Sequence, residues 1–482
     1  MIMPAILWTY SIYITNARRS LTKPRHPLLR MLFLISLYVV KSAYAARQHD
    51  VLDPLENLSF EGNSCELTTL KSICSSLDDD TKRLLDMPSH KIELLSKDEL
   101  LNVYNQLSTK SIFKNLECLD LSGSDIENLP SSIFLHLKNL KILNISKNPG
   151  INLNSPSFKR LCHQLVELNA SECNLDEDML ELICNCNRLE RLNISRNLCL
   201  NLISHGFERL CCRLVELDIS KCCIRETIVP LILPHLKKIK KLNISGNPDI
   251  NLKPDIFEKL CFQLVELHAS ECNIQVNILT SVFSHMEKLK ILDISKNPGI
   301  DLKPEIFEKL CSQLIELNAS ECNIGEDIFS IICGCRKLET LNVSKNPKIK
   351  FPEQKTIALK DTLKNLNIDD CNLSSNDMAK IAEFKCLESL DISNNFLKEY
   401  FEKPDFGGLK KTLSELRACN TGMTFEGISK VQECERLKIL DVSHNNLFKQ
   451  VYFYNFFTRI LRFLLVYQDS QENILFGSLA NK

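Results

Sequence analysis

One apolar pattern repeats through most of the sequence and limits what the chain can fold into more than any other feature. It reads LxxLxLxx(N/C)x(L/I) and occurs fourteen times, with successive starts 24 to 26 residues apart. The first leucine-type positions are Leu116, Leu140, Leu165, Leu189, Leu214, Ile239, Leu264, Leu289, Leu314, Leu338, Leu363, Leu387, Leu413 and Leu437. A unit of this length cannot bury its apolar face alone, so neighbouring copies must stack to share one core.

Within each copy, apolar and polar residues alternate over a short stretch. Leu143 and Ile145 fall on one side of an extended chain, and Asn144 and Ser146 fall on the other. We therefore predict an α/β solenoid of about fourteen coils, with a parallel concave β-sheet and short helical or irregular return segments. With strands about 4.8 Å apart, this sheet is roughly 60 Å long.

The ninth position of the pattern alternates between two residue types. It is Asn148, Asn197, Asn247, Asn297, Asn346, Asn395 and Asn445 in one set of copies, and Cys173, Cys222, Cys272, Cys322 and Cys371 in the other. The first and thirteenth copies depart, with Ser124 and Thr421 at this position. The larger repeat is therefore a pair of copies.

The pattern and its period resemble the leucine-rich-repeat family over residues 116–450. The alternation of Asn and Cys is similar to the ribonuclease-inhibitor type, but units of that type are longer, so the inhibitor's activity is not implied. The resemblance implies that the ninth side chain turns inward and hydrogen-bonds backbone groups of the adjoining coil. Buried backbone groups need such partners.

The N-terminal region has the pattern of a secretory signal. An apolar run, Met31–Val40, follows several basic residues and precedes the small-x-small sequence Ala43–Ala45. Ten apolar residues fall well short of the roughly 20 that a membrane-spanning helix needs. We predict an upstream extension and signal peptide (1–45), an N-terminal helical cap region (46–115), the solenoid (116–450) and an aromatic C-terminal cap and tail (451–482). A secreted or cell-surface location follows, and a cytoplasmic location is the alternative.

The 22 cysteines are expected to be mainly buried thiols that fill repeat positions. Equivalent cysteines such as Cys173 and Cys222 lie two coils apart, roughly 10 Å, whereas bridged Cα atoms lie within about 7 Å. The same argument applies to Cys162, Cys211, Cys261 and Cys311. A bridge between Cys65 and Cys74, which precede the array, stays open.

No metal or cofactor is predicted. The Cys-x-Cys pairs Cys184/Cys186 and Cys333/Cys335 lie several coils apart, and a tetrahedral zinc site needs four converging ligands. Eight N-x-S sequons are present, and most of them are formed by the strand Asn of the repeat. We therefore interpret these asparagines as part of the repeat pattern and not as glycosylation sites. The sequons begin at Asn57, Asn144, Asn169, Asn193, Asn243, Asn318, Asn342 and Asn372.

The outward residues of the strands form the first candidate binding surface. Opposite charges alternate along part of this face, and such neighbours can pair for a few tenths of a kcal/mol each. The candidate residues are Lys147, Asn169, Glu172, Arg191, Asn193, Arg196, Glu216, Asp218, Lys241, Asn243, Glu266, His268, Glu271, Asp293, Lys296, Glu316, Asn318 and Glu321. Because aromatic anchors are missing from these columns, the ends of the solenoid or its convex loops remain an alternative.

The second candidate surface is the aromatic segment after the last repeat. It predicts a cap over the last coil, with a partner or peripheral membrane contact as the alternative. Its candidate residues are Tyr452, Tyr454, Phe456, Phe457, Arg459 and Arg462.

These observations favour a protein-binding module that is not an enzyme. The sequence contains no phosphate-binding glycine loop, HExxH motif or nucleophile elbow. With 59 basic and 60 acidic residues it has no nucleic-acid footprint. Two alternatives stay open: an intracellular structural scaffold, and an adaptor for protein turnover with Leu94–Ile112 as its docking motif. The partner's identity and the oligomeric state are not predicted.

Overall fold

The computed structural model describes residues 117–123, 137–198, 200, 202, 205–250, 252, 262–274, 286–300, 302–353 and 357–445. All of them belong to one unit of the chain, Cys65–Leu479. The predicted signal peptide, the N-terminal cap region and the aromatic segment lie outside the described residues, as do Cys65, Cys74 and Asn57. The predicted domain boundaries therefore stay predictions.

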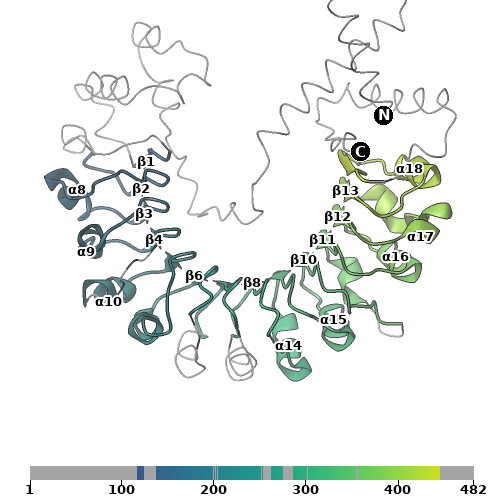
Figure 1. The fold of residues 1–482 in the computed structure, drawn as a ribbon, viewed down its shortest axis with the longest axis horizontal. Coiled ribbons are helices and arrows are strands. Elements are labelled where there is room, and N and C mark those ends of the chain that lie inside the picture. Colours follow the sequence, from purple (N-terminus) through teal and green to yellow (C-terminus); the bar gives the residue numbers. More distant parts are fainter. Residues whose placement is uncertain are drawn as a thin grey trace, which may run out of the picture. The chain divides into compact units, whose positions relative to one another are not determined.

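In the described part of the chain, fourteen strands of three residues each form one sheet, and each strand pairs in parallel with its neighbours in the sequence. Figure 1 shows the strands along the inner side of the repeat array and the helices along its outer side. The strands are β1 (Cys118–Asp120), β2 (Ile142–Asn144), β3 (Glu167–Asn169), β4 (Arg191–Asn193), β5 (Glu216–Asp218), β6 (Lys241–Asn243), β7 (Glu266–His268), β8 (Ile291–Asp293), β9 (Glu316–Asn318), β10 (Thr340–Asn342), β11 (Asn365–Asn367), β12 (Ser389–Asp391), β13 (Glu415–Arg417) and β14 (Ile439–Asp441). The predicted leucine-rich-repeat solenoid with a parallel sheet is confirmed.

The described return segments hold short helices, as the sequence predicts. The α-helices are α8 (Pro156–Leu161), α9 (Glu177–Cys184), α10 (His205–Cys211), α11 (Val229–Ile232), α14 (Pro304–Cys311), α15 (Glu326–Ile332), α16 (Ser375–Ile381), α17 (Lys398–Glu402) and α18 (Phe425–Val431). The 3₁₀ turns are η2 (Leu233–His235), η4 (Ala358–Asp361) and η5 (Gly407–Lys411). Polar caps start several of them: the carboxylate of Asp176 accepts the Met179 N–H at 2.7 Å before α9. No described helix is long and apolar enough to cross a membrane.

The core runs continuously through the array. The middle residue of each strand is a leucine, and Leu143, Leu168 and Leu192 are fully buried. Aromatic residues from the return segments complete this core. Phe329, Phe351 and Phe384 form edge-to-face contacts, with ring centroids 5.0 and 6.4 Å apart. Each coil therefore buries its apolar face against the next, as the alternation predicts.

The ninth-position side chains turn inward and join adjoining coils. The Asn197 amide donates to the carbonyl groups of Ala170 and Ile194 at 2.9 Å, and its Oδ1 accepts the N–H of Cys173 at 3.0 Å. The thiol of Cys173 in turn donates to the Ile145 carbonyl at 3.1 Å. Asn and Cys coils are thus complementary, because the asparagine of one satisfies the backbone of the other.

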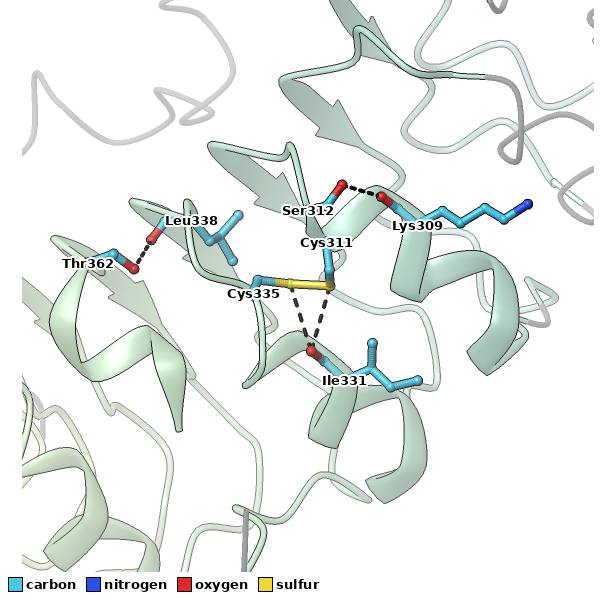
Figure 2. Close-up of a disulfide and its surroundings, with 7 residues drawn as sticks. All are labelled: Lys309, Cys311, Ser312, Ile331, Cys335, Leu338 and Thr362. Atoms are coloured by element: carbon cyan, nitrogen blue, oxygen red, sulfur yellow. Dashed lines mark hydrogen bonds between the residues drawn. A yellow bond between two sulfur atoms is a disulfide. The ribbon is translucent and has the colours of Figure 1, made fainter. Parts of the chain in front are cut away.

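The cysteine prediction needs one correction. Cys311, which ends α14, and Cys335, which follows α15, form a disulfide with Cα atoms 4.7 Å apart (Figure 2). The argument from equivalent positions compared residues two coils apart, but these two cysteines occupy different positions in adjacent coils. Among the described residues no other ladder cysteine is in a disulfide, and Cys173, Cys222 and Cys272 are buried as predicted.

Candidate functional site: the concave face

The predicted concave residues fall into three columns. The first strand position holds Arg191, Glu216, Lys241, Glu266 and Glu316, and the third holds Asn169, Asn193, Asp218, Asn243, His268, Asp293 and Asn318. The parallel register places members of a column side by side on neighbouring strands. Because the middle leucine of each strand points into the core, these two columns face outward on the concave side.

The third column lies in the turn after each strand. Its residues all have left-handed backbone, with φ between 53° and 58°. The column holds Lys147, Glu172, Arg196, Glu271, Lys296 and Glu321. Their N–H groups continue the ladder beyond the strands, as when Glu172 donates to the Ser195 carbonyl at 3.0 Å. These side chains therefore border the concave face at the carboxyl ends of the strands.

Ion pairs link neighbouring coils at the first strand position and at the border of the face. Nε of Arg191 lies 2.7 Å from Oε2 of Glu167, and Nζ of Lys241 lies 3.3 Å from Oε2 of Glu266. At the border, Nζ of Lys345 lies 2.8 Å from Oε1 of Glu321. Glu167 was missed by the sequence reasoning, although its place beside Arg191 at the first strand position is the signal that identifies it.

Most polar residues at the third strand position have a structural task. Oδ1 of Asn169, Asn193 and Asn243 accepts the N–H of the serine two residues further on, at 3.1, 2.9 and 3.0 Å. Asp218 and Asp293 do the same at 2.9 Å. This bond satisfies a backbone donor where the strand ends, so Asn or Asp at this position is explained by the fold alone.

His268 departs from this arrangement. The N–H of Ser270 donates to Oγ of Ser245 at 3.1 Å, so His268 does not cap its own strand. Its Nε2 lies 2.9 Å from Oε1 of Glu266, and its buried Nδ1 makes no hydrogen bond of normal geometry to the described residues. Burial opposes the charged imidazole, but Asp293 and Glu266 outweigh it and raise the pKa of His268 to about 9. The residue is 8% exposed and is charged at neutral pH.

Carboxylates outnumber cations around His268. Glu216, Asp218, Glu266, Asp293 and Glu316 stand on β5 to β9 with two cations, Lys241 and His268; we call these seven residues the central acidic patch. Burial raises the pKa of Glu216, of Asp218 and of Glu316. The nearby cations do not offset the cost of burying these charged carboxylates. An additional positive charge at the patch is therefore favourable.

The described residues offer no metal centre, since no three His, Cys, Asp or Glu side chains among them converge as ligands. The predicted end contact (Tyr452, Tyr454, Phe456, Phe457, Arg459 and Arg462) lies outside the described residues and stays a prediction. The site that the structure brings together is therefore the concave face, with the central acidic patch as its most charged part.

Comparisons with known proteins find similarity to solved structures but not to known sequences. No protein-family model and no curated protein matches the sequence. A leucine-rich-repeat protein of Leptospira interrogans is 19% identical, with a TM-score of 0.48, over 77% of this chain and 98% of that chain. The chain's own fourteen coils, their single parallel sheet and their inward-turned Asn and Cys side chains identify the fold as a leucine-rich-repeat solenoid.

Proposed function

We propose that this chain is a protein-binding repeat module that receives a positively charged segment of its partner on the concave face. A solenoid sheet offers an extended surface for such a partner. The observation that carries the proposal is the central acidic patch, where Asp218 is buried, Glu216 and Glu316 are half-buried, and burial raises the pKa of all three carboxyl groups. An arriving cation would offset the burial of these carboxylates.

Arginine suits this surface best. Its planar guanidinium can donate two hydrogen bonds to one carboxylate, and it is more weakly hydrated than the lysine ammonium. At the first strand position Glu216 neighbours Lys241, which pairs with Glu266. Ile291 separates Glu266 from Glu316. An arginine-bearing segment lying across β5 to β9 would find acceptors on alternate strands. The same negative charge disfavours nucleic acid, whose backbone phosphates would be repelled.

The binding proposal is tested with two labelled peptides, one of alternating arginine and glycine and one of alternating glutamate and glycine. Fluorescence anisotropy is measured with the full chain at rising salt concentration. We expect saturable binding of the arginine peptide that weakens with salt, and no binding of the glutamate peptide. Equal binding of both peptides, or binding of neither, would contradict a cation-binding face.

We also propose that the protein is secreted or displayed at the cell surface. Two features support this: the signal-like pattern of residues 1–45, and the disulfide between Cys311 and Cys335, because disulfides persist mainly in oxidising compartments. N-terminal sequencing of the protein recovered from the medium is expected to give Ala46 first. An intact Met1 or Met31 on soluble protein from the cytosol would contradict secretion.

A second candidate function is an intracellular structural scaffold. It is favoured by the free thiols buried through the ladder, such as Cys222 and Cys272, which suit a reducing compartment as well. The adaptor alternative depends on Leu94–Ile112, which lies outside the described residues. The N-terminal sequencing experiment distinguishes a secreted protein from an intracellular scaffold and from an intracellular adaptor.

A further inference from the structure

The disulfide between Cys311 and Cys335 shows which two positions of adjacent coils can be cross-linked. Cys311 ends α14, and Cys335 lies two residues past the Cys333 cap of α15, 24 residues further along the chain. Figure 2 shows both sulfur atoms facing the carbonyl oxygen of Ile331, at 3.6 and 3.8 Å. The cross-link therefore joins one return segment to the next across a single backbone carbonyl.

The same local arrangement occurs at Cys162 and Cys186. Cys162 caps α8, and Cys186 follows α9, again 24 positions further along the chain. Their sulfur atoms lie 3.5 and 3.8 Å from one carbonyl oxygen, that of Leu182. Leu182 thus takes the place that Ile331 has beside the Cys311–Cys335 disulfide.

Backbone contacts confirm that the two places are equivalent. The N–H of Cys186 donates to the Ile183 carbonyl at 3.0 Å, and the N–H of Cys335 donates to Ile332 at the same distance. Two residues after each first cysteine, a glutamine amide donates to the preceding coil: Gln164 to Leu137 and Gln313 to Met286. The surroundings of Cys162 and Cys186 therefore match those of the disulfide in backbone as well as in side chain.

The two thiols are also neighbours, because the interaction with Cys162, together with burial, raises the pKa of Cys186. Cys162 is 2% exposed and Cys186 is fully buried. Two neighbouring thiols that face one carbonyl oxygen and are shielded from solvent are positioned for a cross-link.

Other coils provide a natural comparison at these positions. Arg213, which corresponds to Gln164, donates to the carbonyl of Cys186, and Gln263 donates to that of Leu236. Leu236 therefore occupies the repeat position that Cys186 occupies two coils earlier. The residue at that position beyond Cys211 is thus a leucine and cannot form a disulfide. Among the described coils, cysteines occupy both of these positions only at Cys162 with Cys186 and at Cys311 with Cys335.

We propose that Cys162 and Cys186 form a second disulfide in the register of Cys311–Cys335. In the reaction, the thiolate of one cysteine attacks a low-molecular-weight disulfide and releases one thiol. The second cysteine then displaces the other half from the mixed disulfide. Two protein thiols lose two protons and two electrons in total, and the small disulfide is reduced to two thiols. Because few thiolates exist once these residues are buried, the bond forms during folding.

The test maps cross-links in the full chain after folding with reduced and oxidised glutathione. Free thiols are alkylated in denaturant without reduction, and the chain is cleaved after glutamate. Cleavage separates residues 128–167 from 182–190, and residues 309–316 from 327–339. We expect a linked 128–167/182–190 species that disappears on reduction, with the linked 309–316/327–339 species as the positive control.

Variants identify the Cys162 end of the bond. Cys162→Ala is expected to leave the 182–190 peptide fully alkylated, whereas Cys211→Ala is expected to leave both linked species in place. The proposal is overturned if Cys162 and Cys186 are alkylated while Cys311–Cys335 is linked, or if 182–190 is linked to the peptide that carries Cys211. The mapping of the unmodified chain gives the answer even if a variant fails to fold.

Discussion

Nε2 of His268 lies 2.9 Å from Oε1 of Glu266 on the same strand, and Asp293 stands opposite His268 on the next. These carboxylates hold the pKa of His268 at about 9 despite burial. In an unfolded chain the pKa of histidine is about 6.5. The stabilising charge is therefore fully present below about pH 6.5 and is lost as the pH rises through about 9.

We predict that replacing His268 with Asn removes this pH dependence. Asn243 and Asn318 show that Asn suits this strand position, since each accepts the serine N–H two residues on. Relative to the variant, the wild type should lose up to about 3 kcal/mol of unfolding free energy between pH 6 and pH 10. Denaturant unfolding at both pH values measures the difference. Equal pH dependence in both proteins would show that His268 is not charged in the folded state.

The asparagine ladder predicts a large stability difference between two similar substitutions. Asn197 is fully buried and serves the backbone groups of Ala170, Cys173 and Leu175. Asn197→Ala leaves these groups without partners and should cost at least about 3 kcal/mol. Asn365→Ala, on an exposed strand position, should cost less than about 0.5 kcal/mol. Thermal and denaturant midpoints of the two variants test this, and a similar loss in both would contradict the role assigned to the ladder.

The fold could be predicted from the sequence because each of the fourteen repeats has the same apolar face that must be buried against a neighbouring repeat. The alternation around Leu143 fixes which side of each strand is buried, and the period fixes one strand per coil. The cysteine pairing could not be predicted in this way. Cys311 and Cys335 occupy different repeat positions, and their approach depends on where helices α14 and α15 end.

The candidate site was predicted in outline but not in its division of roles. The sequence indicates that Asn193, Asp218 and His268 share a column, but all three look equally available there. The structure shows that the Asn and Asp side chains cap their own strands, whereas His268 does not. This difference depends on hydrogen bonds two residues apart, which spacing and composition do not record.

Truncation to alanine should lower the unfolding free energy strongly at one phenylalanine of the array and hardly at all at another. Phe384 is fully buried and contacts Phe351, whereas Phe396 is 80% exposed. Phe384→Ala leaves a cavity in the core and should cost about 3–5 kcal/mol. Phe396→Ala should change the unfolding free energy by less than about 0.5 kcal/mol. Denaturant melts of the pair measure both, and a stable Phe384 variant would show that the aromatic contacts do not support the core.

Adjacent cysteines in one coil should differ in reactivity. Cys222 is buried, which raises its pKa to about 12, and its thiol donates to the Ile194 carbonyl at 3.1 Å. Cys223 is exposed. Iodoacetamide should alkylate Cys223 in the folded protein and spare Cys222, as fragment spectra of residues 217–226 can resolve. Comparable modification of both thiols in native buffer would contradict the burial of the cysteine ladder.

The central claim is that the concave face binds a cationic partner through the central acidic patch. Its most direct test compares the affinity of the arginine–glycine peptide for two double variants that lose the same number of charges. Glu216 and Glu316 become Gln in the first, and Glu172 and Glu321, which border the face, become Gln in the second. The account predicts at least about tenfold weaker binding for the first, equal to about 1.4 kcal/mol, and near-wild-type binding for the second. Equal affinities of the two variants would contradict it.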